Sequence, residues 1–112
     1  MELRKSTRYR LSSPAHYGWE SSDAYSQTSQ GKTRDISARG AFIVADECPP
    51  VGARIELKIL LPKLEGSGVG MRLHGKGHVL RVEQGSTIGT NGFAAFVQFR
   101  PEVPDGAVPS QR

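Results

Sequence analysis

The clearest pattern in the chain is an alternation of apolar and polar side chains over residues 54–61. The apolar residues at every second position are Ile55, Leu57, Ile59 and Leu61. Pro62 ends the run. A period of two predicts a β-strand with one face buried and the other face in solvent.

Five further segments favour strands. Residues 11–19 indicate a first strand that Pro14 interrupts, and residues 24–36 a polar strand with Gly31 as a candidate break. Residues 41–45 are short and apolar, and residues 93–99 place apolar side chains at alternate positions. Within 71–83 the apolar parity changes between Leu73 and Leu80, and we place a β-bulge at Gly75 and Gly77 to account for it.

Six short strands with turn residues between them, and no helical period, predict an all-β fold. A closed or nearly closed six-stranded antiparallel β-barrel solves the problem of exposed sheet edges for such a chain. With 112 residues the chain is expected to form one domain. We divide it into a flexible basic N-terminal arm over 1–10, a barrel over 11–100 and a disordered, proline-containing tail over 101–112.

The net charge of +4 is concentrated in the arm. Residues 1–10 contain Arg4, Lys5, Arg8 and Arg10 against one carboxylate, Glu2. The remaining residues are nearly neutral, which disfavours a long groove for a nucleic-acid polymer. A local cationic arm instead favours a compact anion with one or two phosphates.

Other features exclude several classes of function. Cys48 is the single cysteine, so no disulfide forms within one chain, and no segment is apolar enough to act as a signal peptide or to span a membrane. His74 and His78 would lie about 13 Å apart on a strand, too far to share a metal. Ser37 has no assignable His–Asp pair. We therefore expect a cytoplasmic protein that is not an enzyme and has no metal, cofactor or membrane partner.

Two short clusters carry the candidate chemistry. Arg4 and Arg8 are four residues apart in the arm, and Asp35-x-Ser37-x-x-Gly40 directly precedes an apolar strand. Taken alone, the first cluster reads as a solvated terminus and the second as an ordinary turn, in which Gly40 adopts a positive φ. In this order and about thirty residues apart, they resemble the PilZ domain family, whose pattern is RxxxR followed by [D/N]xSxxG on a six-stranded barrel.

The resemblance covers roughly residues 3–100 and implies a receptor for cyclic di-GMP, a bacterial second messenger. It implies that the arm closes over the ligand against the barrel and so changes the surface offered to an unknown downstream protein. The implied ligand-binding residues are Arg4, Arg8, Asp35, Ser37 and Gly40, with Lys5, Arg10 and Arg39 as secondary candidates.

The chemistry of these residue types suits that ligand. An arginine fork matches the N7 and O6 acceptors of guanine, or holds a phosphate through two hydrogen bonds. A carboxylate accepts from guanine N1–H and N2–H. Two alternatives stay open: a PilZ-type adaptor that binds proteins and no nucleotide, and a small β-barrel that binds RNA or single-stranded DNA.

Overall fold

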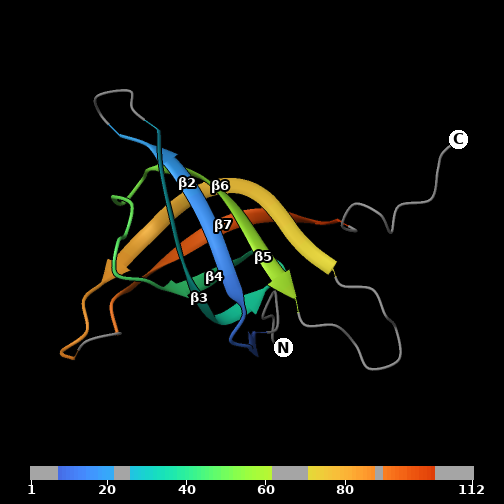
Figure 1. The fold of residues 1–112 in the computed structure, drawn as a ribbon, viewed down its shortest axis with the longest axis horizontal. Coiled ribbons are helices and arrows are strands. Elements are labelled where there is room, and N and C mark those ends of the chain that lie inside the picture. The colour runs from blue at the N-terminus through green and yellow to red at the C-terminus, as the bar shows by residue number, and fades with distance from the viewer. Residues whose placement is uncertain (1–7, 22–25, 62–70, 88–89, 103–112) are drawn as a thin grey trace, which may run out of the picture.

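Figure 1 shows a computed structural model in which antiparallel strands close into a barrel. It describes residues 8–21, 26–61, 71–87 and 90–102. The strand order is β1-β3-β2-β5-β6-β7-β4, and β4 also pairs with β3, which closes the barrel. The strands are β1 (Tyr9–Arg10), β2 (Pro14–Glu20), β3 (Ser26–Ser37), β4 (Gly40–Val44), β5 (Arg54–Leu61), β6 (Met71–Glu83) and β7 (Gly92–Glu102).

The predicted six-stranded barrel is confirmed, and β1 is an additional strand. Tyr9 pairs with Ile36 and Arg10 with Asp35, so the last residues of the predicted arm run along β3. Sequence reasoning had no pattern for this strand because it is only two residues long and both side chains are exposed. Among the described residues, no helix is long and apolar enough to cross a membrane.

The alternating patterns in β5 and β7 place side chains as predicted. Ile55, Leu57 and Ile59 point into the barrel and are at most 3% exposed. From β7, Phe93 and Val97 join them at 0% exposure. Because each fully buried side chain of this size contributes roughly 1.5–3 kcal/mol, these inward rows supply much of the stability that holds the site in place.

Two sequence expectations about β2 and β3 were wrong. Pro14 begins β2 and does not interrupt it, because a proline at the first position costs the ladder no interior hydrogen bond. Gly31 does not break β3, which is continuous from Ser26 to Ser37. A side chain at Gly31 would overlap the carbonyl oxygen of Val44, so glycine is needed there for close packing against the next strand.

The bulge in β6 lies at a different residue from the one predicted. The register shifts between Val79 and Arg81, so the extra residue is Leu80. Gly75 and Gly77 pair regularly with β7, and a side chain at either would overlap a β7 carbonyl oxygen. These glycines allow close approach of the two strands, and they do not change the side of the sheet to which the following side chains point.

Strand β7 extends to Glu102, two residues into the predicted tail. Glu102 pairs with Arg72 of β6 across the ladder, and its carboxylate accepts from Arg72 Nε at 3.2 Å. Residues 103–112, for which we predicted disorder, lie outside the described residues.

Candidate functional site

A hollow of about 240 Å³ on the barrel surface brings most of the predicted site residues together. Its lining includes Arg8, Asp35, Ser37, Gly40 and, from the secondary candidates, Arg39. Arg10 does not line it, although it pairs with Asp35 along β1 and β3. Arg4 and Lys5 lie outside the described residues.

Two β-bulges build opposite walls of this hollow. In β3 the register shifts between Thr33 and Asp35, so Arg34 is the extra residue. In β6 the extra residue is Leu80. A regular strand turns successive side chains to opposite faces, whereas a bulge lets two consecutive residues face the same way. Thus Arg34 and Asp35 on one strand, and Leu80 and Arg81 on the other, all line the hollow.

Asp35 is held in place from its own strand. Arg34 Nε donates to Asp35 Oδ2 at 3.0 Å, and the Asp35 side chain is 16% exposed. The Arg34 guanidinium lies 3.8 Å from the centroid of the Phe42 ring, a close cation–π contact. A carboxylate has about four lone-pair sites, so Asp35 keeps acceptor capacity for a further N–H group.

The turn between β3 and β4 is stabilised by Ser37. Its Oγ accepts the Arg39 N–H at 3.2 Å and lies 3.5 Å from the carbonyl oxygen of Gly40. This is the side-chain-to-backbone bonding expected of a serine in a turn. The Arg39 carbonyl accepts from Val97 N–H at 3.0 Å, which ties the turn to β7.

Gly40 has the positive φ that we expected. Its φ is 159°, a backbone conformation that residues with a side chain rarely adopt. A side chain at this position would also overlap the carbonyl oxygen of Ala95 on β7. Glycine is required because β4 and β7 approach each other closely beside the hollow.

The hollow is strongly cationic. One carboxylate, that of Asp35, lines it together with four arginines, which are Arg8, Arg34, Arg39 and Arg81. Glu83 partly compensates them from outside the lining, at 2.9 Å from Arg81 Nε and 4.0 Å from an Arg34 guanidinium nitrogen. Three of these four arginines belong to the barrel, so the positive charge of the hollow does not come from the arm alone.

Sequence reasoning missed Arg34 and Arg81 as site residues. Arg34 precedes Asp35 directly, and a regular strand would have placed the two on opposite faces. Arg81 is brought in by β6, far along the chain from Asp35. A break in the apolar parity is the signal for a bulge, and in β6 it was detected but assigned to the wrong residues.

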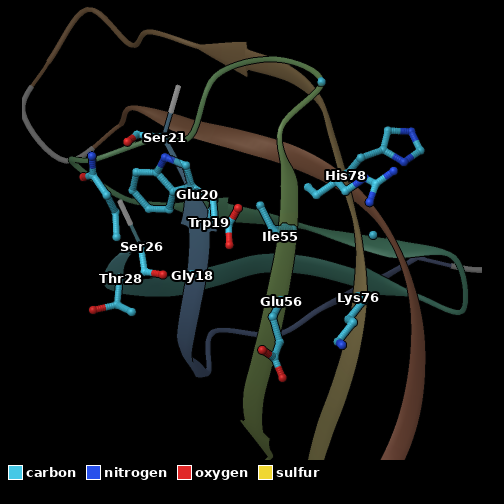
Figure 2. A pocket seen from close by; sticks show the side chains of 14 residues that line it. Gly18, Trp19, Glu20, Ser21, Ser26, Thr28, Ile55, Glu56, Lys76 and His78 are labelled. Atoms are coloured by element: carbon cyan, nitrogen blue, oxygen red, sulfur yellow. The ribbon is translucent and has the colours of Figure 1, made fainter. Parts of the chain in front are cut away.

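A larger groove of about 1050 Å³ lies elsewhere on the barrel (Figure 2). Trp19 and Ile55 line it together with charged and polar side chains from β2, β3, β5 and β6. None of the predicted site residues belongs to this groove. Its size exceeds that of the cationic hollow, but its mixed charges do not form a concentrated anion site.

The thiol of Cys48 is a further reactive group among the described residues. Cys48 donates a long hydrogen bond, 3.6 Å, to the Ala45 carbonyl oxygen, and burial raises the pKa of its thiol, which disfavours a reactive thiolate. Within the described residues, no group of three or more His, Cys, Asp and Glu side chains is placed to hold a metal ion.

Comparison with known proteins identifies the family. The sequence matches the PilZ domain over residues 2–106. The chain belongs to the PilZ domain family. A solved structure with a similar fold is the Bacillus subtilis inhibitor of motility, MotI/DgrA, with a TM-score of 0.68 and 17% sequence identity. The match covers 95% of this chain and 46% of MotI/DgrA, so this PilZ chain spans less than half of that protein. No curated protein matches the sequence.

Proposed function

We propose that this PilZ domain is a receptor for cyclic di-GMP and not an enzyme. The observation that supports the proposal best is the cationic hollow, in which Arg8 of the first motif meets Asp35 and Ser37 of the second. Membership of the PilZ family adds support, as does the description of the similar Bacillus protein as an inhibitor of motility, a regulatory role.

The residues of the hollow match the chemical groups of the ligand. Arginine forks suit both the guanine N7/O6 edge and the phosphates, and four of them face a ligand that carries two negative charges. Asp35 is the acceptor for guanine N1–H and N2–H. The Arg34 guanidinium lies over the Phe42 ring, 3.8 Å from its centroid, and we propose that a guanine base stacks on this guanidinium.

The proposed ligand also needs residues of the arm. Sites for small molecules usually enclose roughly 300–1,000 Å³, and the hollow of about 240 Å³ is below that range. We propose that Arg4, four residues before Arg8, contributes the missing contacts when residues 1–8 fold over the ligand. Because Tyr9 and Arg10 are paired with β3, the closing segment begins immediately before them.

Calorimetric titration with cyclic di-GMP tests the proposal, with cyclic di-AMP as the control ligand. We expect binding of the guanine compound only, because adenine lacks the N1–H and N2–H donors that Asp35 would accept. Asp35→Ala should weaken binding by about 1–3 kcal/mol, and Arg8→Ala should abolish it. Lys32→Ala is a suitable control, because Lys32 is exposed on β3 and does not line the hollow.

A flat titration with folded protein would contradict nucleotide binding and favour the adaptor alternative. Equal affinity for the adenine compound would contradict the role of Asp35 in base recognition. Closure of the arm is tested separately by amide exchange over residues 1–8, which should slow when cyclic di-GMP is added. Unchanged exchange alongside confirmed binding would refute the closure alone.

A further inference from the structure

The outer face of β5, β6 and β7 carries cationic side chains that the proposed nucleotide site does not use. Directly paired residues of neighbouring strands share a face. Arg54 pairs with His78, which pairs with Phe96, and Lys58 pairs with His74, which pairs with Arg100. The even-numbered side chains of residues 54–60, 72–78 and 96–102 therefore lie on this outer face. We call its five cationic residues the basic wall: Arg54, Lys58, Arg72, Lys76 and Arg100.

The carboxylates on the same face are already engaged. Glu56 Oε2 lies 2.5 Å from His74 Nε2, and Glu102 Oε2 lies 2.9 Å from His74 Nδ1. Glu102 is also paired with Arg72. Within the described part of the chain, the other four cations of the basic wall form no ion pair, so the wall has positive charge available for a partner.

The basic wall continues into the large groove shown in Figure 2. Arg54 and Lys76 line this groove, and Trp19, which is partly exposed, provides apolar surface within it. Trp19 stacks on Tyr17 with ring centroids 5.8 Å apart, so the indole is held in a fixed orientation. A partly exposed, rigid tryptophan beside cations is typical of the central contact in a protein interface.

We propose that the basic wall and its groove dock an acidic segment of a partner protein, with one large apolar side chain of that segment against Trp19. A protein segment can place separate carboxylates over Lys76 and Arg100. A nucleic acid or an anionic lipid surface presents evenly spaced phosphates and would meet the carboxylates of Glu20 and Glu56 in the groove.

The proposed docking surface adjoins the cationic hollow. Phe96 lines the hollow, and its ring centroid lies 5.6 Å from that of His78, which lines the groove. A partner on the wall would thus lie one side chain away from an occupant of the hollow. The inference goes beyond the proposed receptor function and does not depend on it.

The test is a titration of the isotope-labelled full chain, without nucleotide, followed by NMR. The probe is a synthetic peptide in which glutamate alternates with serine around one central phenylalanine. We expect the largest shifts at the amides of β5, β6 and β7 and at the Trp19 indole. Lys76→Glu and Arg100→Glu should each weaken binding about fivefold, in keeping with the modest strength of exposed ion pairs. Replacing the phenylalanine of the peptide by alanine should weaken it as well.

Lys32→Glu makes the same change of charge on β3, away from the wall, and should alter the affinity less than about twofold. An equal loss in the Lys32 and Lys76 variants would overturn the proposal, because binding would then follow net charge alone. Tighter binding of oligothymidylate or of phosphatidylglycerol vesicles through Lys76 and Arg100 would also overturn it and assign the wall to phosphate groups. Failure here leaves the cyclic di-GMP titration unaffected, so the two proposals fail separately.

Discussion

Gly40 is part of the PilZ signature, and replacing it by alanine tests whether the glycine serves the barrel or the ligand. A Cβ at residue 40 would overlap the carbonyl oxygen of Ala95, a main-chain atom that moves only with its strand. To admit the methyl group, β4 must separate from β7 around the pairs Gly40↔Phe96 and Ala41↔Ala95. The hydrogen bond from Val97 N–H to the Arg39 carbonyl lies directly beside these pairs.

The expected loss of stability follows from these contacts. Two to three backbone hydrogen bonds at about 1–1.5 kcal/mol each would be broken or weakened. The lower backbone entropy of alanine in the unfolded chain returns about 0.5–1 kcal/mol. The net loss is about 1–4 kcal/mol, which for a domain of this size lowers the thermal midpoint by roughly 5–20 °C.

Thermal and urea unfolding followed by circular dichroism would measure the effect. Gly18→Ala is the matched control, because its Cβ would lie 3.3 Å from the nearest atom, the Gln27 carbonyl oxygen, and only a small adjustment is needed. We expect the control to stay within about 1 kcal/mol of the parent protein. If Gly40→Ala kept the parent midpoint but lost affinity for cyclic di-GMP, the structural explanation of this glycine would be refuted.

Two further substitutions test side-chain hydrogen bonds of the barrel. Thr33 is buried, and its hydroxyl donates to the Leu11 carbonyl and accepts Ser13 N–H at 2.9 Å. Thr33→Val leaves that N–H without a partner and should lower the free energy of unfolding, measured in urea, by about 1–3 kcal/mol. Hydrogen bonds to Glu102 and Glu56 raise the pKa of His74 above its ordinary value of 6.5. The same hydrogen bonds lower the pKa of the Glu56 and Glu102 carboxyl groups. The stability that His74 contributes is therefore complete below pH 6.5 and is lost as the pH rises through the raised pKa. The difference in urea midpoint between the parent and His74→Gln should shrink from pH 6 to pH 8, and a constant difference would contradict this linkage.

The parts of the fold predicted correctly are those in which one strand face is buried along a regular register. In β5 the apolar residues Ile55, Leu57 and Ile59 fix both the element and its facing, because a slip of one residue would expose all of them. Phe93 and Val97 fix β7 in the same way. In these strands the alternation in the sequence reflects the barrel interior directly.

The errors fall where contacts between distant strands decide the local structure. Gly31, Gly75 and Gly77 look like breaks in sequence, yet each sits in a continuous strand pressed against a neighbouring main chain. Local propensity contains no information about that neighbour. Pro14 was misread for the opposite reason, since its effect depends on whether it begins a strand or lies within one.

The candidate site illustrates the same limit. Asp35, Ser37 and Arg8 were predicted from the family pattern, and the structure brings them to one hollow. Arg34 and Arg81 could not be predicted from alternation, because each faces the hollow only through a bulge whose position depends on the partner strand.

The two bulges also explain how a rigid barrel can present a cationic site on its outer surface. A regular strand contributes one outward side chain for every two residues, so paired charges such as Arg34–Asp35 cannot arise without an inserted residue. The second bulge places Leu80 and Arg81 opposite them, and Glu83 lies close to both Arg34 and Arg81. These groups are fixed by strands that bury the core, whereas Arg8 precedes the two-residue strand β1. The geometry therefore places a preformed half of the proposed receptor on the barrel, and we propose that the arm supplies the other half.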